Sequence, residues 1–195
     1  ESLIKHLRPI LEDYFDMISN DQIFIKRTKD IGIISKELVQ ESGGSGPVSR
    51  GSGINFDLRK NKPYECYKEF NFDIPIGKNG DAYDRTLVRM KENVQSLRIV
   101  EQIIEGVPSG ELSTRKPLKS AKLTRPPKGS SYFSVESPRG ELGFFIVSDG
   151  SSIPYRMKIR APSFSNLSII EKLLPGTYFA DSKLSATVEV YCFSN

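Results

Sequence analysis

The sequence has few of the side chains that most often hold metals in proteins. Its 195 residues include two cysteines, Cys66 and Cys192, and one histidine, His6. The cysteines lie far apart and outside any Cys-x-x-Cys pair, so this chain alone is not expected to bind zinc or an iron-sulfur cluster. We expect both thiols to be reduced and buried, with a disulfide only in a secretory setting. His6 lies beside the apolar stripe of the first predicted helix, and we expect its imidazole to be solvated or locally hydrogen-bonded, not a metal ligand.

Long apolar runs and dense charge of one sign are also lacking. No segment approaches the roughly 18 to 20 apolar residues that cross a bilayer, and no targeting pattern opens the chain, so we expect a soluble polypeptide. The 28 basic and 24 acidic residues are interspersed, which does not favour nucleic-acid binding. Hydrophobic residues make up 37%, somewhat low for an independent domain. We therefore expect part of the surface to be buried against partners.

Apolar periodicity predicts a helical first part of the chain. Apolar residues at helical spacing over 3–18 indicate an amphipathic helix that Pro9 kinks or delays. Ser35 is a typical N-cap for a short helix that Gly43 ends. The strongest helix is predicted from an Asp81 cap to Gly106, with its apolar stripe in the core. That stripe comprises Leu87, Met90, Val94, Leu97 and Ile104, widened by Tyr83, Val100 and Ile103.

Strands are predicted mainly in the second part. Aromatic residues between Pro63 and Pro75 indicate an irregular strand over 64–74. An antiparallel meander is expected from three runs, 132–136, 141–147 and 155–160, and a short helix follows Pro162. The predicted fold class is α+β, a mostly helical bundle scaffold with a small antiparallel sheet. Its predicted parts are a scaffold over 1–107, a linker or arm over 108–130, and the meander, short helix and divergent tail over 131–195.

A glycine-rich run from Gly46 to Gly53 surrounds Arg50 and Ser52. Glycines allow positive φ and close backbone approach, so this run predicts a shaped loop. Nucleotide binding is not expected, because the run lacks both the Gly-Lys-Ser/Thr of a phosphate loop and the third glycine of a dinucleotide fingerprint. Ser52 has no histidine nearby in sequence and is a poor candidate nucleophile. No residue of the chain is assigned a catalytic role, and no metal ligand is assigned.

Charged residues near this loop form two candidate groups. A guanidinium matches a carboxylate in bidentate fashion, so these charges form either a functional constellation or a structural network, and we favour the network. The first group holds the loop, and comprises Arg50, Gly51, Ser52, Gly53, Asp57 and Arg59. The second locks the long helix to the loop, and comprises Asp81, Asp84 and Arg85. Glu136 and Glu141 flank a hairpin turn, and we expect them to face solvent or Arg139 and Lys128.

One protein family shares an ordered series of motifs with this chain. The run Ser45-Gly46-Pro47-Val48-Ser49-Arg50-Gly51-Ser52-Gly53-Ile54-Asn55-Phe56-Asp57-Leu58-Arg59-Lys60, with Pro63-Tyr64 and Tyr67, resembles the signature of the 49 kDa subunit of respiratory complex I. Further matching blocks follow in the same order, at 72–77, 80–85, 95–100, 135–143, 147–152 and 154–164. The resemblance extends from about Asp30 to about Asp181. It implies the fold of the C-terminal region of that subunit, related to the hydrogenase large subunit.

The chain also departs from the family. The family's N-terminal half, with the histidine and tyrosine that engage the quinone and the histidine-rich segment near the terminal cluster, has no counterpart here, and His6 matches none of those positions. The segment 115–129 is shorter than in the family, and the sequence diverges after Asp181. Phe56 stands in place of the usual tryptophan. The cysteine pairs of nickel-iron hydrogenases are absent, so no nickel is expected.

The resemblance implies a function inside an assembly. It implies the C-terminal part of a subunit in the quinone-reducing module of a proton-translocating NADH:quinone oxidoreductase. The implied partners are the N-terminal half of the subunit on another chain, the twenty-kilodalton cluster-bearing subunit and the thirty-kilodalton subunit. FMN, iron-sulfur clusters and ubiquinone belong to the assembly, and this chain alone binds no cofactor. The implied location is the matrix side of the mitochondrial inner membrane, or the cytoplasmic side of a bacterial membrane. The alternative is a non-catalytic scaffold or assembly protein that retains this fold.

Overall fold

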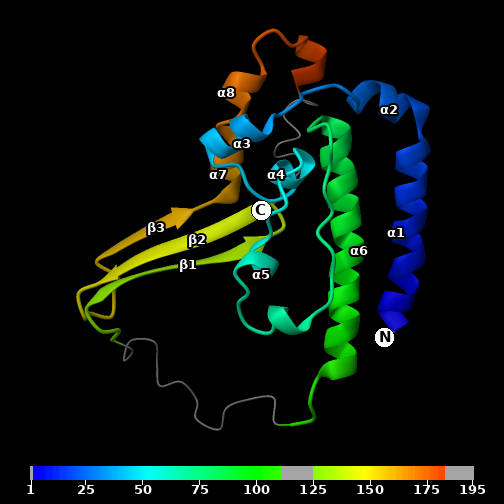
Figure 1. The fold of residues 1–195 in the computed structure, drawn as a ribbon. Coiled ribbons are helices and arrows are strands. Elements are labelled where there is room, and N and C mark those ends of the chain that lie inside the picture. Colours follow the sequence, from blue (N-terminus) through cyan, green and yellow to red (C-terminus); the bar gives the residue numbers. More distant parts are fainter. Residues whose placement is uncertain (1, 111–124, 183–195) are drawn as a thin grey trace.

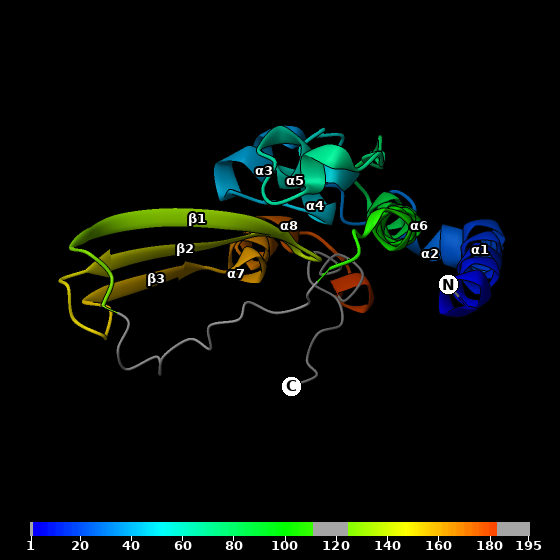
Figure 2. The ribbon, with the colours of Figure 1, turned by 90° about the horizontal axis from the view of Figure 1, so that it is seen from below.

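A computed structural model describes residues 2–110 and 125–182 (Figure 1). A three-stranded sheet lies at one side of the molecule and a pair of long helices at the other, with short helices between them (Figures 1 and 2). The helices are α1 (Ser2–Asn20), α2 (Gln22–Thr28), α3 (Lys36–Ser42), α4 (Pro47–Gly51), α5 (Leu58–Asn61), α6 (Ala82–Gly106), α7 (Pro162–Leu167) and α8 (Ile170–Leu173). Two 3-10 turns, Tyr67–Glu69 and Phe179–Asp181, and the strands β1 (Gly129–Ser137), β2 (Gly140–Ser148) and β3 (Arg156–Arg160) complete the described elements. The α+β prediction is confirmed.

The predicted helix ends are accurate where a capping residue marks them. The Asp81 carboxylate accepts a hydrogen bond from the Asp84 amide at 2.7 Å and begins α6, which ends at Gly106. Ser35 caps α3 in the same way, and Gly43, with φ of 65°, ends it in the left-handed conformation. The prediction that the first helix begins only near Pro9 is wrong, because α1 begins at Ser2 and continues through Pro9. Packing of α1 along α6 outweighs the local cost of the proline.

The predicted strand over 64–74 is wrong. This segment follows α5 and contains only the 3-10 turn at Tyr67–Glu69. Its aromatic rings pack on one another: the rings of Tyr64 and Tyr67 are 4.9 Å apart, and those of Tyr67 and Phe70 are 6.3 Å apart. Tyr64 also packs edge-on against Phe133 of β1, at 6.0 Å, so the segment meets the sheet through side chains and not as a paired strand. The glycine-rich loop likewise contains a short helix, α4, with Pro47 at its first turn.

The sheet confirms the predicted meander. Its strands are ordered β1-β2-β3 and all pairs are antiparallel. The tight turn after β1 brings Ser137 opposite Gly140 and Glu136 opposite Glu141. The single short helix predicted after Pro162 is two helices, α7 and α8. A small apolar core under the loop joins segments far apart in sequence, and comprises Ile34, Val39, Val48 and Ile169.

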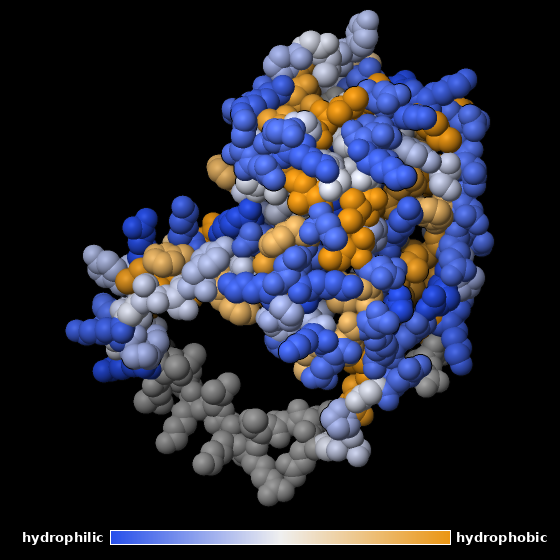
Figure 3. All heavy atoms as spheres, in the orientation of Figure 1, coloured by the Kyte–Doolittle hydropathy of each residue, from blue (hydrophilic) through white to orange (hydrophobic). Residues whose placement is uncertain are grey.

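The long helix α6 buries a different face from the one predicted. Its buried side chains are Ala82, Arg85, Val88 and Ile99, which point into the body of the protein. The predicted stripe is only half-buried along most of its length, and its end is exposed at Val100, Ile103 and Ile104. Apolar side chains accordingly show at the surface over α6 (Figure 3). Periodicity identifies apolar positions, and it does not say which of them this chain covers.

The scarce cysteine and histidine residues lie at the surface or outside the described part. Cys66 is an exposed free thiol, so the prediction that it is buried is wrong: it precedes an exposed 3-10 turn and no core element covers it. Cys192 and the divergent tail from residue 183 onward lie outside the described residues. His6 is exposed on α1, as predicted. Most of the predicted linker over 108–130 is likewise outside the described residues, and the division into three parts stays a prediction.

Candidate functional site

Arg50 is the centre of a buried charged cluster. Helix α4 carries it inward, where its side chain is 2% exposed. Its Nε donates to the Glu92 carboxylate on α6, and one terminal nitrogen donates to the Glu136 carboxylate on β1 at 2.9 Å. The same nitrogen donates to the Phe56 carbonyl at 3.1 Å and lies 3.5 Å from the Asp57 carboxylate. One side chain therefore ties the loop to the long helix and to the sheet.

Asp57 and Arg59 extend this cluster at the start of α5. The Asp57 carboxylate caps the helix by accepting from the Arg59 amide at 2.9 Å. The Arg59 guanidinium grips the same carboxylate with two nitrogens, at 3.0 and 2.7 Å. Its planar group also lies 5.0 Å from the centre of the Phe72 ring. These contacts fix the DLRK part of the family signature against the loop.

The cluster brings two guanidinium groups and three carboxylates out of water. Burial acts to lower the pKa of Arg50, but the charges of Glu92 and Glu136 outweigh it and the pKa is raised. Burial acts to raise the pKa of Asp57, but hydrogen bonds and charge from Arg59 and Arg50 bring it below its ordinary value. For Glu92, burial prevails over the attraction of Arg50, and its pKa is raised. The pKa values of Arg50 and Glu92 are thus raised above their ordinary values, and the pKa of Asp57 is lowered.

Asp57 makes the stability of the fold sensitive to acid. Because its pKa is depressed, its ionised form stabilises the fold above its ordinary value of 3.8, and this contribution is lost as the pH falls below about 3.8. Glu92 acts in the opposite sense, since its raised pKa lowers stability as the pH rises through about 4.5. We expect urea unfolding midpoints of Asp57→Asn to fall less steeply in acid than those of the unaltered chain. Superimposable pH profiles would contradict this assignment.

Asp81, Asp84 and Arg85 form a second group at the start of α6. The Asp81 carboxylate accepts from the Asp84 amide and also from the Asp30 amide at 3.0 Å. The Asp84 carboxylate accepts from the amides of Lys78 and Asn79, both at 2.6 Å. The Asp81 and Asp84 carboxylates therefore bind backbone amides. Among the described residues, no recorded ion pair joins either carboxylate to Arg50 or Arg59.

Arg85 completes the second group. One terminal nitrogen donates to the carbonyls of Gly32 at 2.8 Å and Gly80 at 2.7 Å. Burial and the nearby charge of Arg89 lower the pKa of Arg85 to about 10, against the attraction of Asp81 and Asp84. The guanidinium thus holds two loop carbonyls against the first turn of α6.

Removing the Asp81 carboxylate is expected to cost about 2 kcal/mol of folding free energy, because a helix loses its cap and two partly buried amides lose an acceptor. Asp81→Ala tests this by urea denaturation. Asp81→Asn keeps an oxygen acceptor and should retain at least half of the stability that alanine removes. Equal losses in both variants would contradict a role as hydrogen-bond acceptor.

Gly51 is where the two groups meet. A Cβ atom at Gly51 would lie 2.7 Å from the Cγ of Arg85, so glycine allows α4 to approach α6 closely. The Ser52 hydroxyl donates to the Val48 carbonyl at 3.2 Å and is buried, so it acts within α4. Gly53 takes a φ of 81° and turns the chain out of the helix. The predicted loop residues are therefore brought together, although Arg50 and Arg85 bind different partners.

The sequence predictions missed Glu92 and assigned the wrong surroundings to Glu136 and other partners to Glu141. Glu92 lies in no motif that would single it out, and Glu136 is 5% exposed in its side chain instead of facing solvent. Glu141 contacts Arg160, at 3.6 Å, and Tyr132, two partners that were not predicted. The signal that was available for Glu136 is its place in the 135–143 block, which matches the family in the same series as the Arg50 loop.

Asn166 links the loop to the hairpin turn from a third direction. It is buried on α7, accepts from the Ser45 amide at 3.0 Å and donates to the Arg139 carbonyl at 3.2 Å. Ser45 in turn accepts from the Glu141 amide at 3.1 Å. The loop, the hairpin and α7 are therefore held together by both charged and neutral contacts.

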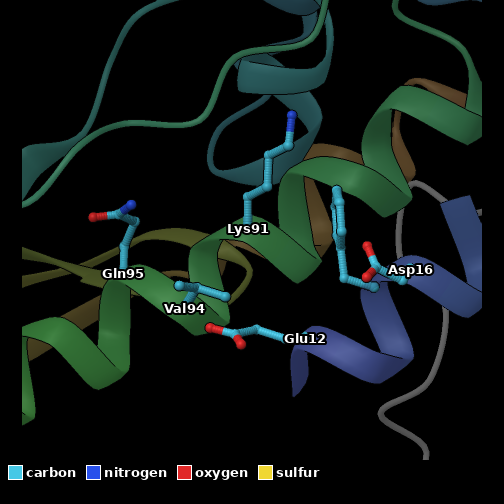
Figure 4. A pocket seen from close by; sticks show the side chains of 6 residues that line it. Glu12, Asp16, Lys91, Val94 and Gln95 are labelled. Carbon is cyan, nitrogen blue, oxygen red and sulfur yellow. The ribbon is translucent and has the colours of Figure 1, made fainter. Parts of the chain in front are cut away.

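Hollows lie along α6 on either side of the helix. One, of about 410 Å³, opens beside the charged cluster and is lined by Arg50, Arg59, Arg89, Glu92, Asn93, Ser96, Glu136, Ser137 and Pro138. Another, of about 390 Å³, lies between α1 and α6, where Figure 4 shows Glu12 of α1 near Val94 of α6 and Asp16 further along α1. Within 2–110 and 125–182, no cluster of three or more histidine, cysteine or acidic side chains is arranged to hold a metal ion. In the same ranges, no helix combines the length and apolar character needed to span a bilayer.

Comparisons with known proteins relate this arrangement to one family. The family model described as "Respiratory-chain NADH dehydrogenase, 49 Kd subunit" matches residues 1–125 and 118–192. The D subunit of NADH-quinone oxidoreductase from Desulfotalea psychrophila is 46% identical over 179 residues, which cover 92% of this chain and 47% of that protein. The protein of the same name from Bacillus cereus is 44% identical over 182 residues, which cover 93% of this chain and 49% of that protein.

A solved structure shares the fold as well. A chain in the membrane-bound sulfane sulfur reductase, an archaeal respiratory membrane complex, is 36% identical, with a TM-score of 0.88 over 97% of this chain and 52% of that chain. The chain thus spans about half the length of the relatives it matches. On the family model and on these identities, the chain belongs to the family of the 49 Kd subunit of respiratory-chain NADH dehydrogenase.

Proposed function

We propose that this chain is the C-terminal part of a subunit of this family and shapes the quinone-reducing module of a proton-translocating NADH:quinone oxidoreductase. The observation that carries the proposal is the way the family signature is held: the loop over 45–60 is fixed by buried ion pairs to α6 and β1. Such a loop presents a constant surface to neighbouring subunits. In this proposal the chain positions the site and none of its residues is catalytic. Activity belongs to the complex.

The proposal assigns the reactive groups to partner polypeptides. These partners are the N-terminal half of the subunit, encoded as a split gene or supplied by a related chain, the cluster-bearing subunit and the thirty-kilodalton subunit. FMN, iron-sulfur clusters and ubiquinone would be bound by the assembly. The coverage of about half of each relative supports the need for a second half.

The proposed location is the peripheral arm of a membrane complex. The two curated relatives described above are bacterial and the structural relative is archaeal, which favours the cytoplasmic side of a bacterial membrane over the mitochondrial matrix side. The same observation bears on the electron acceptor, because the solved relative belongs to a sulfane sulfur reductase. The experiment that tests assembly therefore also tests which electron acceptor the complex uses and which membrane it belongs to.

The test is to purify an affinity-tagged copy of the chain from its own cells under native conditions. We expect it to migrate with a large membrane complex that contains the N-terminal half and both other partner subunits and that reduces quinone with NADH. Migration near 21.9 kDa without these partners would instead support the non-catalytic scaffold. A complex that reduces sulfane sulfur and not quinone would contradict the quinone assignment.

A further inference from the structure

Helix α1 has a wider apolar face than its packing on α6 requires. One stripe faces α6 and includes Ile4, which is 8% exposed, and the half-buried Leu11 and Phe15. Arg8 lies in the same direction and pairs with Glu101 of α6. A second apolar stripe runs alongside the first. It comprises Leu3, Leu7, Ile10, Tyr14 and Met17.

The second stripe has the spacing of a helix-packing seam. Its members alternate steps of four and three residues, as the core positions of helical bundles do. At about 100° per residue they fall within an arc of about 80°, to one side of Ile4. Leu3, Tyr14 and Met17 expose 68, 53 and 59% of their surface, and Leu7 and Ile10 are half-buried, so the described chain covers this seam only in part. Its length at 1.5 Å per residue is about 21 Å.

Helix α6 continues the same surface. Val100 and Ile104, with Val107 at the end of the helix, lie three and four residues apart and expose 41, 42 and 60%. Glu101 faces α1, and these three residues lie to one side of it around α6. Because the two helices run antiparallel, this is the side of the helix pair on which the second stripe lies relative to Ile4 of α1. The hollow between α1 and α6 that Glu12, Asp16 and Lys91 line lies on the opposite side of this helix pair (Figure 4).

From these observations we propose that the groove between the second stripe of α1 and the exposed Val100, Ile104 and Val107 of α6 is the seat of a third helix, supplied by the half of the subunit that this chain does not include. We call this groove the third-helix seat. Two antiparallel helices with adjoining apolar stripes are completed by a helix that lies in the groove between them. An exposed apolar surface of this kind marks an interaction site.

The occupant follows from the coverage of the relatives. The chain matches 47% of the Desulfotalea protein and 52% of the solved chain, so a comparable length of polypeptide in each relative remains to pack against it. In this respect the inference rests on the proposed function. It adds the location of the joint between the two halves.

The test uses the part of the Desulfotalea protein that this chain does not match, co-expressed with this chain carrying an affinity tag. We expect the two to purify as a one-to-one complex. Met17→Glu and Val100→Glu should each weaken the complex at least about tenfold, because a carboxylate would be buried in the seat. Ile153→Glu is the matched control, since Ile153 is 74% exposed but lies outside the seat, and it should bind as tightly as the unaltered chain.

Three results would overturn the proposal. Binding that is unaffected by either substitution would place the joint elsewhere and leave the proposed function intact. Self-association of the chain that Val100→Glu abolishes would show a second copy in the seat. No binding by the unaltered chain would remove both this inference and the idea of a missing half. Circular dichroism of each variant shows whether α1 and α6 remain folded, so a loss of binding can be assigned to the seat.

Discussion

Arg50→Ala is expected to lower the free energy of unfolding by about 3 to 5 kcal/mol, the usual cost of removing one partner from a buried ion pair. The substitution leaves Glu92, Glu136 and Asp57 with one guanidinium, that of Arg59, in a place shielded from water. The loop also loses its tie to the Phe56 carbonyl. Urea denaturation of the chain measures the change. If the proposed function holds, the same substitution in the complex should abolish assembly, and NADH:quinone activity with it.

The control for this prediction is Arg98→Ala. Arg98 pairs with Asp73 on the surface at 3.2 Å, with side-chain exposures of 41 and 74%, and exposed pairs contribute about 0 to 1 kcal/mol. Arg50→Lys is informative as a second variant, because it keeps the charge but cannot bind several partners in fixed directions. A destabilisation by Arg50→Ala no larger than that of Arg98→Ala would show that the cluster does not hold the loop.

The sequence predicts those parts of the fold that have local signals. The Asp81 cap, the Ser35 and Gly43 ends and the turns of the meander depend on residues a few positions apart, and all are confirmed. The prediction for 64–74 is wrong because its aromatic residues resemble a strand when taken alone. Whether they pair with a strand or stack on each other depends on what lies beside them, which no local pattern contains.

The candidate site is predicted incompletely for the same reason. Arg50, Asp57 and Arg59 lie close together in the sequence, so their association could be expected. Glu92 and Glu136 are 42 and 86 residues from Arg50, and nothing in their own surroundings marks them as its partners. The ordered family motifs indicate which blocks belong to one protein, but the pairing of charges between blocks requires the fold.

Gly46→Ala is expected to destabilise the fold by about 2 to 6 kcal/mol, the sum of a backbone cost and a contact cost. Gly46 has a φ of 69° and a ψ of −142°, a region that only glycine adopts readily and that costs a side-chain-bearing residue about 1 to 3 kcal/mol. A Cβ there would also lie 2.6 Å from the Arg139 carbonyl oxygen and from the Gly140 amide nitrogen. Both are backbone atoms of the hairpin turn, so the loop or the sheet has to shift, and forcing such contacts costs about 1 to 3 kcal/mol more. Thermal and urea denaturation measure the loss.

Gly43→Ala is the comparison variant. Gly43 has a φ of 65° and a ψ of 28°, in the left-handed helical region, and a Cβ there meets nothing within 4 Å, so alanine there costs only that backbone conformation, about 1 to 2 kcal/mol. Gly46, with a ψ of −142°, is in a region that only glycine adopts readily, so the difference between the two variants measures its less favourable backbone conformation together with the contact between the loop and the hairpin turn. That contact closes the glycine run onto the block that carries Glu136, and it brings Glu136 within reach of Arg50. Equal effects of the two substitutions would mean that this approach can relax freely, and that the ion pairs alone position the loop.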